Sequence, residues 1–198
     1  MINTIRQTDV DGTDADSVSN AIINGRQENF KLFEIMKKHF PGFKNAKIRE
    51  IASTLGVRET NRIVGEYTLS VDDVVSAKDF DDSVALTAYG WDMPNPKDPS
   101  YQPFENVKRS SPFTQIPYRC LLPKDTKNLI AIGRCISVER EVLGPCRVMG
   151  PCIAMGEAAG IATALALKTD SDYGSVDIKE IQNKITQYGG YFKREQVK

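Results

Sequence analysis

The sequence predicts an α+β fold, because strand-like and helix-like segments follow one another without an internal repeat. The apolar run at 129–132, closed by Gly133, is typical of a strand that is buried on both faces. Residues 151–167 begin with Pro, are rich in Ala and Gly and precede Lys168, which is typical of a helix. Glu157 is the single charge within this helix, so we expect it to be buried almost all round.

Other segments fit the same fold class. Apolar residues at three- and four-residue steps predict a helix over 17–40, and Pro41 follows it. Residues 62–69 have the composition of a strand, and Ser70 with two following aspartates is a helix-start signal. The remaining predicted elements are a weak amphipathic stretch at 46–55, a helix or strand at 80–88, an extended segment at 116–122, a turn at 173–175, a surface helix at 176–188 and a frayed tail at 193–198.

Residues 91–117 are predicted to be an irregular excursion with six prolines and four aromatic side chains. A segment of this length without regular structure is usually either functional or disordered. Disordered segments contain few aromatic residues, so the composition favours a functional loop that shapes a pocket.

Composition excludes several classes of protein. Lys plus Arg equals Asp plus Glu at 26 each, so nothing suggests a nucleic-acid or membrane partner. Residues 151–167 are short and hold one Glu and two Gly, which makes them a poor transmembrane helix. Residues 1–12 lack the apolar core of a signal peptide, so we expect a cytoplasmic protein. Four scattered cysteines and one histidine predict neither a disulfide framework nor a metal site.

The connection between the predicted strand and the predicted helix is rich in arginine. Arg134, Arg140 and Arg147 precede a helix N-terminus, whose free N–H groups and positive dipole end favour an anion or an electron-rich carbonyl. These arginines could form a site for such a ligand, or they could pair with the nearby glutamates. The residues alone do not separate the two interpretations.

Two further pairs of residues are candidates for chemistry. Cys146 and Cys152 flank the start of the same helix, where a thiolate would be stabilised, but small buried apolar residues are the commoner role for free cysteines. Tyr118 and Arg119 lie in an extended segment between two prolines. They could present a phenol and a guanidinium to a substrate, or they could pack against the next strand.

Residues 57–74, 116–137 and 147–167 together resemble the C-terminal half of a bacterial family of FAD-dependent oxidoreductases. Members of that family have a glutathione-reductase-like flavin domain and are distantly similar to fumarate reductase and succinate dehydrogenase flavoproteins. The resemblance covers about residues 1–170. It implies FAD as the cofactor, and hydride transfer between a small-molecule substrate and the flavin as the reaction. The implied fold is an incomplete α/β-type FAD domain joined to a mixed substrate or cap region.

The resemblance also implies roles for individual residues. The strand that ends at Gly133 would be the second flavin-binding strand, and the helix from Pro151 would point its N-terminus at the pyrimidine edge of the flavin. Arg147 resembles an arginine with which fumarate reductase relatives hold a substrate carboxylate, although Met149 replaces a glycine of that motif, which makes a flavin contact the safer role for Arg147. The implied flavin-binding residues are Gly133, Arg134, Gly150, Pro151, Cys152, Ile153, Ala154 and Gly156, and the candidate catalytic residues are Arg147, Tyr118 and Arg119.

The resemblance divides the chain into a helical segment at 1–44, a substrate or cap region at 45–125 and the C-terminal part of an FAD-binding domain at 126–198. The sequence has no G-x-G-x-x-G loop, which holds the FAD pyrophosphate in such enzymes. We therefore expect a fragment that is inactive alone, binds FAD weakly or not at all, and self-associates as a homo-oligomer. Such a fragment would be either a truncated gene product or a chain whose N-terminal FAD-binding half is supplied by a second polypeptide. Two alternatives remain: a non-catalytic interaction module, or a small-anion-binding domain that uses Arg134 and Arg147.

Overall fold

The computed structural model describes residues 2–93, 104 and 106–197 of the chain. The chain forms two compact units, Met1–Thr60 and Asn61–Lys198. Most of the predicted excursion at 91–117, namely residues 94–103 and 105, lies outside the described residues. The described part contains both helices and a small antiparallel sheet, so the predicted α+β fold class is confirmed.

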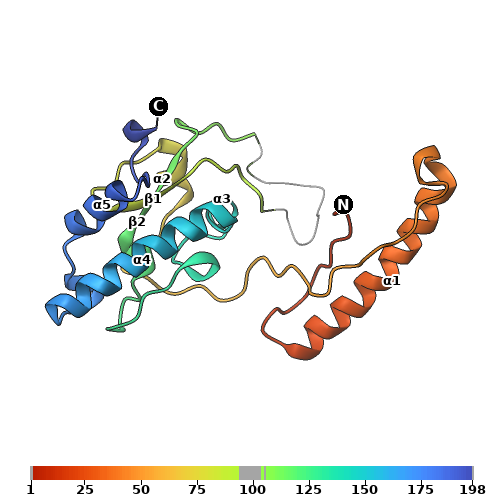
Figure 1. Ribbon diagram of the computed structural model, residues 1–198, viewed down its shortest axis with the longest axis horizontal. Helices are drawn as coiled ribbons and strands as arrows, with labels where there is room; N and C mark the ends of the chain where they lie inside the picture. The colour runs from red at the N-terminus through yellow and green to blue at the C-terminus, as the bar shows by residue number, and fades with distance from the viewer. Residues whose placement is uncertain (1, 94–103, 105, 198) are drawn as a thin grey trace. The chain divides into compact units, whose positions relative to one another are not determined.

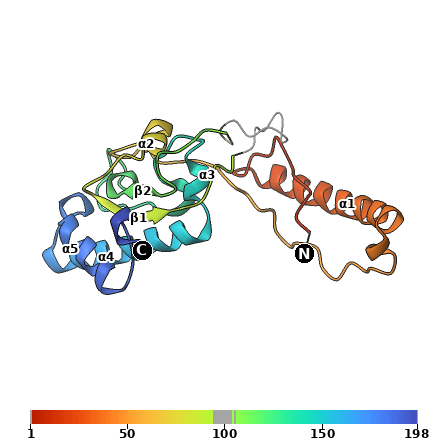
Figure 2. The ribbon, with the colours of Figure 1, turned by 90° about the horizontal axis from the view of Figure 1, so that it is seen from above.

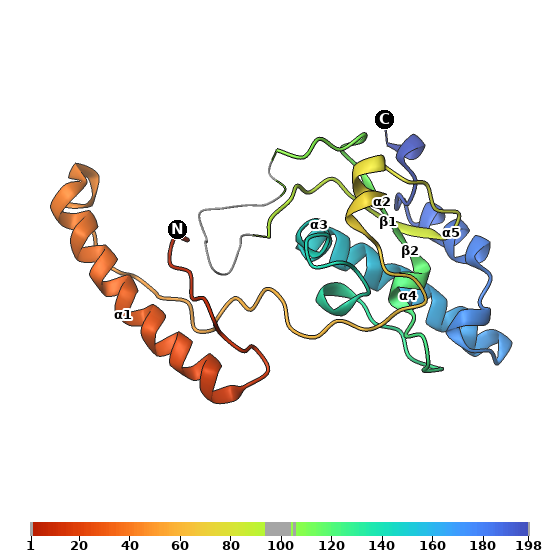
Figure 3. The same ribbon diagram turned by 180° about the vertical axis from the view of Figure 1, so that it is seen from behind.

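The first unit is built on one long helix, α1, which spans Ala15–His39 (Figures 1 and 3). The carboxylate of Asp14 caps it by accepting hydrogen bonds from the N–H groups of Asp16 and Ser17. The predicted helix at 17–40 is therefore confirmed, with its start set two residues earlier by this cap. The short 3₁₀ helix η1, Pro41–Phe43, follows, and residues 46–55 form neither helix nor strand.

The second unit contains the two strands of the described part of the chain, β1 (Ser83–Thr87) and β2 (Thr114–Pro117). They pair antiparallel, with Ala85 opposite Ile116 and Thr87 opposite Thr114, and the register shifts between Ser83 and Ala85. The segment at 80–88, which the sequence left open between helix and strand, thus supplies a strand. The strands are buried along nearly their whole length.

The described residues of this unit form four α-helices, and the sequence predicted three of them: α2 (Val71–Ser76), α4 (Met149–Thr169) and α5 (Ile178–Gln187). The fourth is the short α3 (Leu143–Cys146). Figure 2 shows α4 and α5 on one side of the strands and α2 on the other. The remaining 3₁₀ helices are η2 (Tyr118–Leu121), η3 (Gly133–Cys135), η4 (Tyr173–Ser175) and η5 (Arg194–Gln196).

The core of the second unit lies between β1 and α4, and it draws on residues from both sides of position 125. Its fully buried members include Leu69, Val84, Ile116, Leu121, Ile136, Leu143, Met155, Ala158, Ala162 and Ile181. Residues 61–125 and 126–198 thus share one hydrophobic core. The functional division of the chain at 1–44, 45–125 and 126–198 stays a prediction.

The prediction of a buried strand at 129–132 is wrong. Leu129 is 49% exposed and Ile132 is 39% exposed, and residues 129–132 belong to no strand. The segment makes one backbone hydrogen bond to η2, from the Ala131 N–H to the Leu121 carbonyl. Residues 62–69 similarly form isolated bridges, Gly65 with Pro123 and Leu69 with Val138, in place of the predicted strand.

The prediction that the helix at 151–167 is buried almost all round is also wrong. One face of α4 is buried, and it carries Met155, Ala158 and Ala162. The opposite face leaves Ile153 71% exposed and Leu167 79% exposed. By length and composition α4 could cross a membrane, a property that core helices of other proteins share, and here it packs on β1 and α5.

The C-terminal tail, which the sequence predicts to be frayed, is held in place. The Arg194 guanidinium donates to the carbonyls of Lys78 and Phe113 and lies 3.0 Å from Oδ1 of Asp79. The side-chain oxygen of Gln196 accepts hydrogen bonds from the N–H groups of Phe192 and Lys193. The tail therefore fastens the segment before β1 to the segment before β2.

Gly65 offers a test of the bridges around η2. A Cβ atom at this position would lie 2.6 Å from Cβ of Ser137 and 3.2 Å from the carbonyl oxygen of Arg119. Gly65→Ala should lower the free energy of unfolding by about 1 to 3 kcal/mol, because a methyl group overpacks this contact. Urea denaturation measures the change. Gly90→Ala is the control, since among the described residues only its chain neighbours lie within 4 Å of its Cβ position. Equal stability of the two variants would contradict the prediction.

Candidate functional site

The N-terminus of α4 lacks the side-chain cap that α1, α2 and α5 have. Side chains of Asp14, Ser70 and Asp177 cap α1, α2 and α5, whereas Val148 at the start of α4 provides no side-chain acceptor. The first turn also contains no acidic residue. The helix end therefore keeps its positive field and N–H groups for an electron-rich group outside the helix.

The segment at 132–135 lies against the first two turns of α4. Gly133 has φ +76°, a left-handed conformation that favours glycine, and its Cβ position lies 3.8 Å from Sγ of Cys152. Cδ1 of Ile132 lies 3.7 Å from the Cβ position of Gly156. Burial raises the pKa of Cys152, and the positive charge of Arg134 opposes that effect. The structure thus brings the two groups of predicted flavin-binding residues, 133–134 and 150–156, together.

The surface next to this helix end is apolar and open. Met149 is 82% exposed and Ile153 is 71% exposed, and Ile132 contacts the Cβ position of Gly156, one turn after Ile153. Among the described residues, nothing beyond the adjacent turns of α4 itself lies within 4 Å of the Cβ position of Gly150. Large apolar side chains at such exposure commonly mark a binding surface when they occur together. The combination of apolar contacts, open glycines and uncapped N–H groups fits an aromatic ring that carries an electron-rich edge.

Arg147 does not face this surface. Its side chain is 6% exposed, and its Nη2 donates to the carbonyl of Asp92 at 2.6 Å and lies 3.5 Å from Oδ2 of the same residue. Gly144 in α3 is equally close to this segment, because its Cβ position lies 2.8 Å from the Asp92 nitrogen. Arg147 therefore anchors residues 92–93 to the start of α4.

Tyr118 and Arg119 lie in η2, and the extended conformation predicted for this segment ends at Pro117. The Tyr118 hydroxyl donates to the Tyr173 carbonyl at 3.0 Å, and burial raises the pKa of Tyr118. The Arg119 guanidinium pairs with Asp82, with Nε 2.9 Å from Oδ2 and Nη2 3.2 Å from Oδ1. The candidate catalytic residues thus belong to separate clusters, Arg119 with Asp82 and Arg147 with Asp92.

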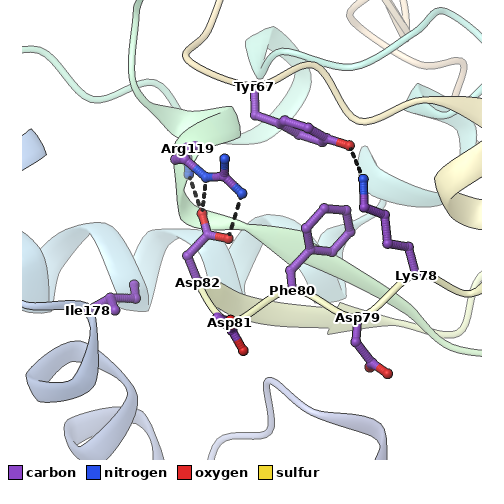
Figure 4. Close-up of a pocket in the computed structure, with 8 residues that line it drawn as sticks. All are labelled: Tyr67, Lys78, Asp79, Phe80, Asp81, Asp82, Arg119 and Ile178. Carbon is purple, nitrogen blue, oxygen red and sulfur yellow. Dashed lines mark hydrogen bonds and ion pairs between the residues drawn. The ribbon is translucent and has the colours of Figure 1, made fainter.

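Arg119 belongs to a second group of polar residues that sequence reasoning missed (Figure 4). The Tyr67 hydroxyl donates to Oδ2 of Asp73 at 2.7 Å and accepts from the Lys78 ammonium at 2.9 Å. The Lys78 ammonium lies 3.1 Å from Oδ1 of Asp73. Asp73 is also the N3 residue of the capping box of α2, where Oδ2 accepts from the Ser70 N–H. The helix-start signal found Ser70 and Asp73, but nothing local in the sequence points to Tyr67 or Lys78.

Two of the four cysteines, Cys120 and Cys146, lie in the core and are inaccessible to a substrate. Cys120 and Cys146 are fully buried, and burial raises the pKa of Cys120 to about 12. Burial raises the pKa of Cys146 as well. Within the part of the chain that the structure describes, no group of three or more His, Cys, Asp or Glu side chains is placed to hold a metal ion.

Comparison with protein-family models gives one match over nearly the whole chain. A model described as FAD dependent oxidoreductase matches residues 2–185. No curated protein and no solved structure matches the chain.

The Asp73 cluster generates a prediction about stability and pH. Burial of Asp73 opposes its ionisation, but hydrogen bonds from Ser70, Tyr67 and Lys78 outweigh that effect and lower its pKa below the ordinary value. Asp73→Asn should therefore lower the free energy of unfolding at about pH 7 by about 1 to 3 kcal/mol. A lowered folded-state pKa means that this loss is present above the unfolded pKa of about 3.9 and disappears as the pH falls through the folded pKa.

Urea denaturation of the wild type and the variant over a range of pH measures this difference. Asp72→Asn is the matched control, because Asp72 lies in the same first turn of α2 but is exposed. A difference between wild type and Asp73→Asn that persists unchanged at acid pH would contradict the prediction.

Proposed function

Because this chain belongs to the FAD dependent oxidoreductase family, we propose that it contributes the flavin-ring side of a site where hydride passes between a small-molecule substrate and FAD. The observation that carries the proposal is the surface formed by residues 132–134 and the first two turns of α4. Bound FAD would supply the ring that accepts or donates the hydride. The chain's own residues would hold that ring and stabilise its charge.

Each part of the surface would contact a different part of the flavin ring or support those contacts. The uncapped N–H groups at the start of α4, with the charge of Arg134, would stabilise negative charge on the electron-rich edge of the ring. Met149 and Ile153 would contact its apolar part, since both side chains are largely exposed beside that helix end. Gly150 and Gly156 would let the ring approach the backbone closely. Pro151, Cys152 and Ala154 would keep the first turns in place.

The ADP part of FAD would be held by a Gly-rich dinucleotide-binding loop that these 198 residues do not contain. Such a loop supplies the backbone N–H groups that bind the pyrophosphate, and the sequence of this chain contains no G-x-G-x-x-G. In this proposal the isolated chain recognises the flavin ring alone and turns over no substrate. The roles of Tyr118, Arg119 and Arg147 in hydride transfer stay predictions.

Titration with three ligands tests which part of FAD this chain recognises. FAD and FMN should bind with dissociation constants that agree within about threefold, and ADP should not bind, because only the ring contacts the chain. The quenching of flavin fluorescence and the shift of the visible flavin band measure binding. Binding of FAD that is tighter than that of FMN by about a hundredfold or more would show that the chain also holds the ADP part.

A matched pair of variants tests whether the flavin ring binds beside the start of α4. Ile153→Glu places a carboxylate at the proposed ring surface and should weaken FMN binding at least about tenfold, because the charge loses water against an apolar ligand. Leu167→Glu is the control, since Leu167 is 79% exposed near the other end of the same helix. Equal weakening by both variants, or by neither, would contradict the proposed placement.

A further inference from the structure

A surface hollow of about 450 Å³ lies beside η2 and the segment that leads into β1. It is lined by Tyr67, Lys78, Asp79, Phe80, Asp81, Asp82, Arg119 and Ile178. None of these residues belongs to the proposed flavin surface. In Figure 4 the side chains of Tyr67, Lys78, Phe80, Asp82 and Arg119 gather on one side of the segment 78–82, and the carboxylates of Asp79 and Asp81 point to the other side.

The carboxylates near the gathered side chains are already satisfied within the protein. Asp82 accepts three hydrogen bonds from Arg119, one from the backbone N–H and two from the guanidinium. Asp73, which does not line the hollow, is 8% exposed and accepts from Tyr67, Ser70 and Lys78. The Tyr67 hydroxyl both donates and accepts. These groups have little capacity left to accept a hydrogen bond from a ligand.

The unused capacity on this side consists of cationic donors. A guanidinium has five N–H donors, and Arg119 uses Nε and Nη2 for Asp82, which leaves its Nη1 group. An ammonium has three donors, and Lys78 uses two of them, for Tyr67 and Asp73. Both side chains are about half exposed, at 49% and 48%, so a ligand can reach them.

Aromatic rings hold the two cations in place. The Lys78 ammonium lies 5.2 Å from the ring centroids of both Tyr67 and Phe80, and the Arg119 guanidinium lies 5.1 Å from that of Tyr67. The two rings pack edge to face with centroids 5.4 Å apart. Cations over aromatic faces are attracted by the ring quadrupole. The donors are therefore positioned before any ligand arrives, which reduces the entropy cost of binding.

We propose that this hollow binds a small monocarboxylate, whose oxygens accept from Lys78 and Arg119 and whose apolar body contacts the ring of Tyr67 and Ile178. The ligand must be an acceptor, because the unused groups are donors. It must carry little charge, because Lys78 and Arg119 are each paired with a carboxylate, Asp73 and Asp82, so this side of the hollow carries no excess of positive charge. That balance disfavours polyanions such as nucleotide phosphates. The binding does not require the flavin, so it stands apart from the proposed function.

Benzoate tests the proposal on the unaltered chain. Amide and Arg Nε–H resonances in ¹⁵N-correlated NMR spectra should shift saturably at about millimolar benzoate, and the largest shifts should belong to residues 78–82 and 118–119. Inorganic phosphate at the same concentration should produce weaker shifts there. The absence of saturable shifts, or shifts centred on Arg134 and Arg140, would overturn the proposal.

Variants of Lys78 and Arg119 test whether these two side chains donate the hydrogen bonds to the carboxylate. Lys78→Gln should weaken benzoate binding by about threefold to tenfold, since one half-exposed cation is removed. Arg119→Lys keeps the charge but loses the planar fork, and it should also weaken binding. Lys127→Gln is the control, because Lys127 is 86% exposed away from the hollow. Wild-type affinity in both pocket variants would overturn the proposal, and the native NMR map decides the question should either variant fail to fold.

Discussion

The packing of α4 on β1 is the contact on which the second unit depends. A two-stranded antiparallel hairpin is marginally stable by itself in water, and here one face of α4 supplies the other half of the core. The buried residues of that face are small, with Ala158 and Ala162 fully covered next to Met155. Small side chains allow the helix backbone to approach the strand closely, so the position of α4 is tightly defined.

The position of α4 in turn sets the position of the flavin surface. Residues 132–135 contact the first turns of α4 through Gly133 and Ile132, and α3 joins α4 directly. The buried face of α4 fixes the helix, which leaves the opposite face, with Ile153, uncovered next to the helix start. A rigidly held helix end is a suitable support for a cofactor, because preorganised dipoles need no rearrangement when charge develops.

Signals within a few residues predicted most helices of this fold. The errors lie where the structure depends on contacts between residues that are far apart in the sequence. Asp14 and Ser70 announce α1 and α2 through their own hydrogen bonds to the next turn, so the information lies within four residues. The run at 129–132 looks like a buried strand, but a strand needs a neighbour, and its composition does not say whether one exists. The Ala- and Gly-rich sequence of α4 likewise carries no periodicity that separates its buried face from its exposed face.

The contacts within the candidate sites also differ in whether the sequence could predict them. Gly133 and Cys152 could be associated before the structure was known, because the family resemblance links the two segments. The cluster around Arg119 could not, since Tyr67 and the segment 78–82, which carries Lys78 and Asp82, meet Arg119 through the fold alone. The sequence also did not predict which way the Arg147 side chain points. An arginine that is buried and donates to the Asp92 carbonyl looks the same in the sequence as one that contacts a substrate.

The contacts of Arg194 link the last residues of the chain to the pairing of β1 with β2. The strands β1 and β2 are joined by a long connection, and closing a long connection costs conformational entropy that the few paired residues of the hairpin must offset. Arg194 bonds to the segments that precede both strands, at Lys78 and Phe113. It therefore acts as a non-covalent cross-link, and part of the closure cost is met by residues that lie about eighty positions beyond the hairpin. Formation of the central hairpin and docking of the chain end should consequently be one cooperative event.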